Sequence, residues 1–497
     1  MENNDYIILN PDYHFKVDGN RVLLYSKRNV HSYSASDWLS VIHPYQANLL
    51  CRFSELKTYE EHCKKIAKDF NITLLQAELM MKQYVENSTP VYTVFGSNKI
   101  VFPQNVLIKL STSGKMPQKE SIDDLQDYSD IDLANGRMRK APHSLELILT
   151  TKCATKCKYC YADKKTSCKE LTTKKILDII DSAVLLKMSN IDVVGGEVFL
   201  KKDWALILKR LVETNLTPNY ISTKVPIGET TVKELFDTGY NNVVQISFDS
   251  LSDKTLKETI GVKLGYVAQM KETIKNLEEY GFKIQIDTIL TKYNSTKDEI
   301  DALFDYIKNI RNLVYWEIRV PEESIYSPAS FNEVKASKKD LVDIRQYIND
   351  NIVPKAKFQV FCSDAALEEQ FYKGALKDDC FKGGACSILQ NRLFVLPDGK
   401  VTICEQLYWN PAFLVGDLKK QSLEEIWQSP KAKAIYAMNK DAISKDSGCY
   451  SCNSYADCNK KHRKCIVKIT KAYGAKHWDY PDPRCCKAPK VQHNYLY

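Results

Sequence analysis

Six short apolar runs, separated by stretches of helical periodicity, occupy residues 144–320. The runs lie at 145–150, 190–195, 218–222, 242–248, 282–290 and 312–320. Between the first two, Ile176, Ile180, Ala183 and Val184 recur at the spacing of an amphipathic helix. Strands that alternate with helices in this way form a parallel sheet. We therefore predict an α/β fold, a partial (β/α)6 TIM-like barrel with its chemistry at the C-terminal ends of the strands.

Sixteen cysteines restrict the chemistry that such a fold carries. The N-terminus is acidic and unlike a signal peptide, and no apolar run is long enough to cross a bilayer. We therefore expect a cytoplasmic protein without a membrane partner, in which clustered cysteines more often bind metal than form disulfides. The net charge of +8 fits an anionic partner or a lysine-rich solvated surface equally well.

Three of the cysteines directly follow the first predicted strand. Cys153, Cys157 and Cys160 have the spacing C-x3-C-x2-C. Thiolates are ligands of both iron–sulfur clusters and zinc, and each of these sites usually has four protein ligands. Three thiolates in one loop leave one iron of a cluster open for an outside ligand. The alternative is a zinc site with a remote fourth ligand.

The cysteine loop, with Tyr159 just before its last cysteine, resembles the signature of the radical S-adenosylmethionine (SAM) superfamily. The resemblance implies a [4Fe–4S] cluster whose open iron chelates SAM. It further implies reductive cleavage of SAM to a 5′-deoxyadenosyl radical, which abstracts hydrogen from the substrate. In such proteins the aromatic residue at the position of Tyr159 packs near the adenine.

Two later strand ends also resemble SAM-binding motifs of that family. Gly195, Gly196 and Glu197 resemble its GGE motif, which holds the SAM amino group, and glycines let the backbone approach a ligand closely. Ser247 and Asp249 resemble its Ser-x-Asp pair near the SAM ribose and carboxylate, although a strand-end cap is the alternative. Ser222-Thr223-Lys224 replaces the Thr-Asn-Gly of many relatives, so we predict no SAM role there.

The C-terminal cysteines resemble a SPASM domain, a radical SAM extension with two auxiliary [4Fe–4S] clusters. The resemblance rests on the steps Cys380-x5-Cys386, Gly399-x4-Cys404 and Cys449-x2-Cys452-x5-Cys458. It implies that Cys380, Cys386 and Cys404 ligate the first auxiliary cluster. It assigns Cys449, Cys452 and Cys458 to the second, which Cys485 or Cys486 completes.

The fourth ligand of the first auxiliary cluster departs from the SPASM pattern. His462 stands where that pattern places a cysteine, and the nearest cysteine is Cys465. We favour Cys465 as the ligand. The alternatives are His462, since histidine ligates some clusters, or an open site that could bind a substrate thiolate. Taken alone, this tail also has the appearance of a zinc ribbon.

The N-terminal residues 1–103 resemble a RiPP recognition element, the winged-helix module that binds leader peptides of ribosomally made, modified peptides. A hairpin is predicted over Phe15–Tyr25 with its turn at Asp18-Gly19. Helices are predicted from Pro44, over Tyr59–Phe70 and on to about Asn87, with extended chain at 91–103. Residues 104–143 are expected to form a linker, 144–320 the barrel, 321–379 a bridging region and 380–497 the SPASM domain.

Together these resemblances imply an enzyme that modifies a precursor peptide bound through its leader. A thioether or another side-chain or backbone cross-link is the expected product, and a flavodoxin or ferredoxin is the expected external electron donor. One alternative is an anaerobic sulfatase-maturase-like enzyme that forms formylglycine, for which Asp287 is the candidate base, although Asp287 could equally be a packing carboxylate. Another is a zinc-ribbon nucleic-acid-binding protein, but no arginine-rich or aromatic stripe supports it.

Overall fold

The computed structural model describes residues 5–26, 38–117, 119–123, 130–134, 136–365, 386–461 and 464–491. Cys380 and His462, two of the candidate ligands, lie outside these ranges. The chain divides into two compact units, Met1–Ala141 and Pro142–Tyr497. Each unit is described by itself.

The N-terminal unit contains a three-stranded antiparallel sheet in the order β2-β3-β4, formed by Tyr13–Asp18, Arg21–Ser26 and Leu39–Ile42. The predicted hairpin is present, but Asp18 still pairs with Arg21, so the two-residue turn is Gly19-Asn20. Gly19 takes the turn because its φ of 70° lies in the left-handed region, where a Cβ is disfavoured.

Three helices follow this sheet: α1 (Pro44–Cys51), α2 (Tyr59–Phe70) and α3 (Leu74–Lys82). The second and third begin at capping boxes made by Thr58 with Glu61 and by Thr73 with Gln76, which fix both starts in the sequence. Helix α3 ends before the predicted Asn87. The extended residues 91–103 form a hairpin of β5 (Val91–Phe95) and β6 (Asn98–Phe102).

The segment expected to be a linker, 104–143, contains regular structure that packs within the N-terminal unit. Strand β7 (Leu107–Lys109) pairs with β1 (Ile7–Leu9), and helix α4 (Leu110–Ser113) follows it. Further along, the buried Arg21 donates to the carbonyls of Ala134, at 2.6 Å, and Arg137, at 3.1 Å. The boundary between the units therefore lies after Ala141.

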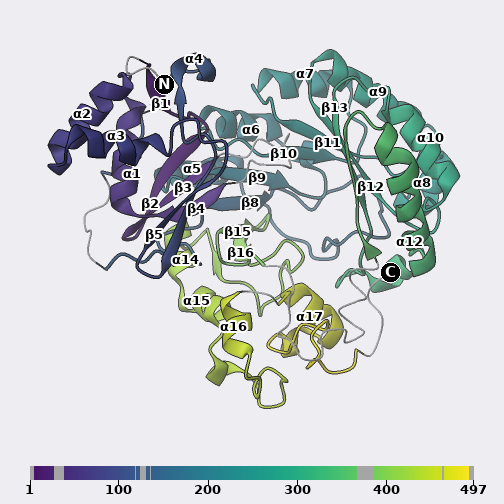
Figure 1. Ribbon diagram of the computed structural model, residues 1–497. Helices are drawn as coiled ribbons and strands as arrows, with labels where there is room; N and C mark the ends of the chain where they lie inside the picture. Colours follow the sequence, from purple (N-terminus) through teal and green to yellow (C-terminus); the bar gives the residue numbers. More distant parts are fainter. Residues whose placement is uncertain are drawn as a thin grey trace. The chain divides into compact units, whose positions relative to one another are not determined.

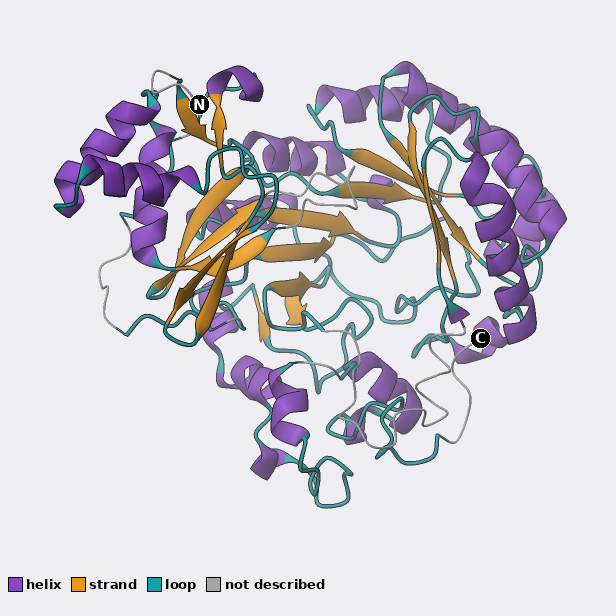
Figure 2. Cartoon of the chain, viewed as in Figure 1, coloured by secondary structure: helices purple, strands orange, loops and turns teal. Residues whose placement is uncertain are grey.

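All six predicted barrel strands are present in the C-terminal unit (Figure 1). They are β8 (Ser144–Ile148), β9 (Asn190–Val194), β10 (Tyr220–Thr223), β11 (Val243–Ser247), β12 (Ile284–Ile289) and β13 (Leu313–Arg319). Helices separate successive strands: α5 (Thr173–Leu185), α6 (Trp204–Glu213), α7 (Glu229–Asp237), then both α8 (Asp253–Ile260) and α9 (Tyr266–Glu279) between β11 and β12, and α10 (Lys297–Ile307) before β13. Figure 2 shows helices along the outer side of the strands. The predicted α/β architecture is confirmed.

The strands form two sheets, and elements outside the six βα units extend both of them. Strand β14 (Gln359–Cys362), in the bridging region after α11 (Pro328–Asn332) and α12 (Lys338–Tyr347), pairs in parallel with β13. The other sheet has the order β17-β16-β15-β8-β9. Its β15 (Arg392–Val395) and β16 (Lys400–Thr402) form an antiparallel hairpin, and β17 (Gly416–Asp417) pairs with β16. Pairing of β15 with β8 therefore joins the SPASM region to the first barrel strand.

The cysteine-rich region beyond β17 consists of short helices joined by long loops (Figure 1). They are α14 (Leu423–Gln428), α15 (Pro430–Ala437), α16 (Tyr455–Lys460) and α17 (Ile466–Tyr473). Their small core contains Met438, Ile443, Cys449 and Tyr455, and Cys452 packs against it. The Cys449 side chain is therefore part of this core, and that of Cys452 borders it.

Candidate active site and cluster-binding sites

The three cysteines after β8 lie in one loop and carry free thiols. The Thr155 hydroxyl lies 3.2 Å from the Cys153 sulfur and 3.3 Å from the Cys157 sulfur. The amide of Cys160 donates to the carbonyl of Cys157 at 3.3 Å, which turns the third cysteine back toward the second. The loop thus brings the sulfurs of Cys153 and Cys157 to one hydroxyl, and the backbone of Cys160 to that of Cys157. Their role as ligands of one iron–sulfur cluster stays a prediction.

The end of helix α8 holds this loop in place. The amide of Lys156 donates to the carbonyl of Ile260 at 2.8 Å, and the amide of Lys158 donates to that of Thr259 at 2.9 Å. These carbonyls belong to the last turn of the helix, where intrahelical donors run out. The helix that follows the Ser247–Asp249 strand end therefore fixes the cysteine loop.

Gly195 and Gly196 follow β9 and press against the residues that lead into the cysteine loop. The Gly196 amide donates to the carbonyl of Thr150 at 2.8 Å. A Cβ on Gly196 would lie 2.3 Å from the carbonyl oxygen of Lys152, and one on Gly195 would lie 2.9 Å from that of Thr150. We expected these glycines to admit a ligand; the close approach in the structure is between two stretches of backbone.

Glu197 is buried directly beyond the two glycines, with 3% of its surface exposed. It accepts hydrogen bonds from the Thr223 hydroxyl at 3.0 Å and from the Lys224 amide at 3.2 Å. Burial raises the pKa of Glu197 to about 7, against the effect of these donors. A cationic amino group placed beside it would restore the ionised form, which fits the SAM role that the resemblance implies.

Asp249, just beyond the end of β11, contacts side chains from both the cysteine loop and the end of β10. The Tyr159 hydroxyl donates to its Oδ2, and the Lys224 Nζ lies 2.9 Å from the same oxygen. Its Oδ1 accepts from the amide of Ile289 at 3.0 Å. Burial, and then the charge of Asp249, raises the pKa of Tyr159 well above its usual range, so this hydroxyl stays protonated and donates. Ser247 ends β11 two residues before Asp249.

Lys224 is a central residue that the sequence did not single out. Its ammonium contacts Asp249 and lies 5.6 Å from the centroid of the Tyr159 ring. The hydroxyl of Tyr266 donates to its carbonyl at 2.6 Å, which fixes the turn after β10. The available signal was a lysine at the C-terminal end of a buried parallel strand, where such folds collect functional groups.

Asp287 lies in register with Ser247, but its oxygens are fully engaged. Gln245 and Gln285 each donate an amide hydrogen to it at 2.7 Å, and Arg319 forms an ion pair with it. Burial raises the pKa of Asp287 to about 6, and Arg319 opposes that rise. This environment, with Arg319 as the cationic partner, fits the packing role that was the alternative for Asp287.

Cys386, Cys404 and Cys465 form one group of thiols. The pKa of Cys386 is raised to about 11, mainly by burial and to a smaller extent by the nearby Cys465. Burial and then Glu405 raise the pKa of Cys404, with smaller effects from Cys465 and Cys386. These electrostatic effects indicate that Cys465 lies in the neighbourhood of the two cysteines predicted for the first auxiliary cluster.

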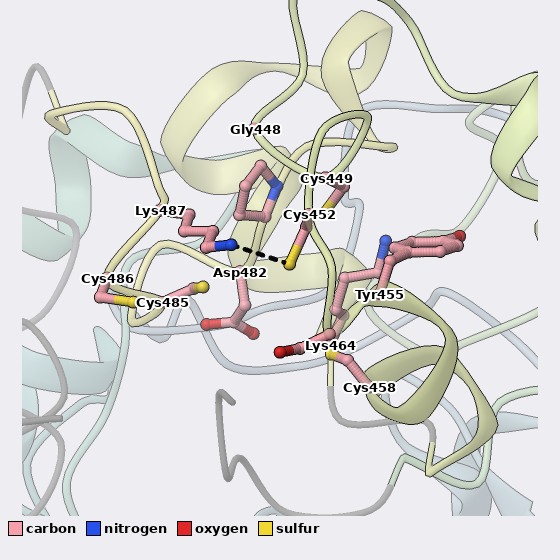
Figure 3. Close-up of a pocket in the computed structure, with 12 residues that line it drawn as sticks. Gly448, Cys449, Cys452, Tyr455, Cys458, Lys464, Asp482, Cys485, Cys486 and Lys487 are labelled. Carbon is pink, nitrogen blue, oxygen red and sulfur yellow. Dashed lines mark hydrogen bonds between the residues drawn. The ribbon is translucent and has the colours of Figure 1, made fainter. Parts of the chain in front are cut away.

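Five other cysteines line one pocket of about 460 Å³ in the C-terminal region (Figure 3). They are Cys449, Cys452, Cys458, Cys485 and Cys486. The ammonium of Lys487 lies 3.3 Å from the Cys452 sulfur. Burial raises the pKa of Cys485, with smaller effects from Cys486, Cys449 and Cys458, whereas Cys486 itself is exposed. This favours Cys485 over Cys486 as the fourth ligand.

Thiols placed around a shared space fit iron–sulfur clusters. In the described part of the chain, no three cysteine, histidine or carboxylate side chains converge closely enough for one metal ion. A cubane cluster spreads its four cysteine ligands over separate irons, so it does not need them to meet at a point. Separate thiols around a shared space are therefore compatible with a cluster.

Comparison with known proteins identifies both domains. Residues 147–307 match the model of the radical SAM superfamily, and residues 386–453 match that of SPASM, an iron–sulfur cluster-binding domain. A PqqA peptide cyclase of Granulibacter bethesdensis is 26% identical over 155 residues, 31% of this chain and 41% of the relative. A GTP 3′,8-cyclase of Synechocystis is 25% identical over 198 residues, 38% of this chain and 55% of the relative. The chain thus spans about half the length of these curated relatives.

A solved structure shares the fold over nearly the whole chain. Streptococcus suis SuiB bound to SAM has a TM-score of 0.62 and 16% identity, covering 96% of this chain and 99% of that one. SuiB bound to its precursor peptide SuiA gives the same TM-score at 15% identity, covering 96% and 98%. The protein therefore has a radical SAM barrel followed by a SPASM domain, and its cofactors are SAM and [4Fe–4S] clusters. No helix among the described residues is long and apolar enough to span a membrane.

Proposed function

We propose that this radical SAM enzyme modifies a ribosomally made precursor peptide and forms a thioether or another cross-link in it. The supporting observation is the combination of three parts in one chain: a unit of strands and helices at 1–141, a radical SAM barrel and a SPASM domain. SuiB, which shares this fold over 96% of the chain, has been crystallised with a precursor peptide. The PqqA peptide cyclase also acts on a peptide.

The N-terminal unit would bind the leader of that peptide as a RiPP recognition element. Its sheet β2-β3-β4, three helices and β5-β6 hairpin have the element order of a winged helix. A leader that adds as a strand needs a sheet edge with available backbone groups. On the β2 edge, the Phe15 amide already donates to Glu120 at 3.1 Å. We therefore assign leader binding to the opposite edge, at β4.

In the barrel, the chain's residues would hold and orient the cofactors. Cys153, Cys157 and Cys160 would ligate a [4Fe–4S] cluster, which with SAM supplies a carbon radical that abstracts hydrogen from the peptide. Glu197 would accept the SAM amino group, because its buried carboxyl gains a cation there. Asp249 would lie near the ribose and Tyr159 near the adenine.

In the SPASM domain, the two thiol groups would hold auxiliary clusters. Cys386, Cys404 and Cys465 would ligate the first, with Cys380 as the remaining candidate. Cys449, Cys452, Cys458 and Cys485 would ligate the second. An external carrier of the flavodoxin or ferredoxin type would supply electrons.

The test is incubation of the anaerobically purified enzyme with SAM, a reductant and the peptide encoded beside its gene, followed by mass spectrometry. A cross-link removes two hydrogens from the peptide and is accompanied by 5′-deoxyadenosine. Cys157→Ala is the control, because it removes a cluster ligand and should leave the peptide mass unchanged. An unmodified peptide with the cluster-loaded wild-type enzyme would reject the proposal.

The sulfatase-maturase alternative receives no support from Asp287. Two glutamine donors and Arg319 occupy its carboxylate, whereas a base needs an oxygen directed at the substrate proton. Reaction of the product with an aldehyde-specific probe would distinguish the two outcomes, since formylglycine carries an aldehyde and a cross-link does not.

A further inference from the structure

Two neighbouring hollows flank Cys452 in the C-terminal region. One is the five-cysteine pocket (Figure 3), whose lining includes Lys464 and Lys487. The other, of about 680 Å³, is lined in part by Lys440 and Lys460. Cys452 and Tyr455 line both. Four lysines, which we call the lysine rim, therefore line the two hollows that share Cys452.

The lysine rim touches Cys452 and reaches the surface. The Lys487 ammonium lies 3.3 Å from the Cys452 sulfur, and that of Lys440 lies 3.5 Å from the Cys452 carbonyl. Lys440, Lys460 and Lys487 are exposed, and Lys464 is half-buried. The exposed Lys487 thus links the protein surface directly to Cys452, a candidate cluster ligand.

Few acidic groups among the described residues offset the positive charge of the rim. In the described part of the chain, none of its four lysines forms an ion pair with a carboxylate. Asp482 is the one acidic residue among those that line either hollow. It is fully buried and paired with Arg484 at 2.8 Å, so it does not offset the rim. The surface here offers concentrated positive charge to a partner.

We propose that the lysine rim is the docking surface for a small acidic one-electron carrier protein of the flavodoxin or ferredoxin class. The carrier would lose one electron, and the cluster held by the surrounding cysteines would gain it; no covalent bond forms or breaks. The proposal rests on the cluster assignment above and adds the place where electrons enter.

Two physical features favour a carrier over an acidic peptide as the partner. The encounter of redox proteins is weak and small, and complementary charge speeds it without requiring deep burial. Lysines suit such contacts, because each is a flexible, strongly hydrated point charge rather than a rigid bidentate fork. The contact between Lys487 and Cys452 places a candidate cluster ligand next to the docked carrier, as electron transfer requires. Peptide binding would not require a cluster ligand at the surface.

The test compares two variants with the same change in net charge. Lys440→Glu/Lys460→Glu reverses two rim lysines that do not contact a thiol. Lys419→Glu/Lys420→Glu reverses two exposed lysines that line neither hollow. On cluster-loaded protein, the affinity of a purified acidic flavodoxin would be measured across salt concentrations. The rate at which reduced flavodoxin bleaches the clusters would be followed by stopped flow, with dithionite as a small reductant.

We expect the rim variant to bind flavodoxin about tenfold or more weakly, with slower cluster reduction and a flatter salt dependence. The control variant should behave like the wild type. Iron content and reduction by dithionite should be the same in all three, which would show that the clusters are intact.

Equal flavodoxin affinity in the two variants would overturn the docking proposal. So would a rim variant that takes electrons from flavodoxin normally but loses affinity for the precursor peptide, because the rim would then be a peptide surface. Peptide modification driven by dithionite is a separate measurement. Its absence, alongside rim-dependent reduction by flavodoxin, would reject the proposed peptide function and leave the docking surface standing.

Discussion

The Tyr159 hydroxyl donates a hydrogen bond to Asp249 and thereby joins the cysteine loop after β8 to the end of β11. The same carboxylate oxygen pairs with Lys224 from the end of β10. Three strand ends thus meet at one buried carboxylate, of which 3% is exposed. Its neighbours should therefore affect the stability of the barrel as well as cofactor binding.

Replacement of Lys224 by methionine should destabilise the protein. The change leaves the Asp249 charge buried with one partner fewer, which typically costs about 3 kcal/mol in the free energy of unfolding. Chemical denaturation of the cluster-free protein measures it. The double variant Lys224→Met/Asp249→Asn should recover part of the loss, because it removes both charges. A double variant no more stable than the sum of the two single changes would contradict this coupling.

Gly196→Ala should displace the cysteine loop. The new Cβ would lie 2.3 Å from the Lys152 carbonyl oxygen, and rigid backbone on both sides must shift to make room. We expect less iron in the purified protein and lower thermal stability. Gly228→Ala is the matched control, because a Cβ there meets nothing within 4 Å. Equal iron content in both variants would show that the loop tolerates the shift.

Glu197 should make stability depend on pH. Its pKa rises from 4.5 to about 7 on folding, so the folded state holds the proton more tightly than the unfolded state. The associated stability is fully present below pH 4.5 and is lost as the pH rises through about 7. The shift corresponds to roughly 3 kcal/mol. The free energy of unfolding of Glu197→Gln, measured against wild type from pH 4.5 to 8, should rise by about that amount. A pH-independent difference would contradict the burial of an ionisable Glu197.

The sequence predicted the barrel strands because each is a local apolar run between helices of clear periodicity. It could not predict that β15 pairs with β8, with Arg392 opposite Ser144, because no local pattern encodes a contact between residues so far apart. The polar segment before Ala141 was predicted to be a linker because its packing partners are also distant in the sequence. The partners that satisfy its backbone, such as Arg21, lie more than a hundred residues earlier.

Some residues of the candidate site could likewise be predicted from the sequence, and others could not. The motifs located Cys153 and Glu197 because their residue types and spacing carry the chemistry. Lys224 was given no role from the sequence, because its importance comes from Asp249 and Tyr159, which only the folded chain brings to it. The close approach of Gly196 to the Lys152 backbone was hidden for the same reason, since that backbone belongs to another loop. The SAM-binding role expected for the two glycines stays a prediction.

Cys485→Ala should remove iron from the second auxiliary site, and Cys486→Ala should not. Cys485 is partly buried and close to Cys449 and Cys458, whereas its neighbour is exposed. Iron and sulfide analysis with electron paramagnetic resonance of the reduced protein would measure the difference. Iron loss confined to Cys486→Ala would reverse the assignment.

Cys465→Ala should remove iron from the first auxiliary site, because its thiol lies beside Cys386 and Cys404. Its amide also donates to the buried Asp482 at 2.8 Å, which fixes the start of α17 and holds the sulfur in position. Cys465→Ala and His462→Ala would be compared by iron content and by the electron paramagnetic resonance spectrum of the reduced clusters. If Cys465 is the ligand, its loss changes the signal of one auxiliary cluster and the histidine variant matches wild type. The opposite result would assign the cluster to His462, whose imidazole would raise its reduction potential. Wild-type behaviour in both variants would mean that neither residue ligates the cluster, leaving an open iron available to a substrate thiolate.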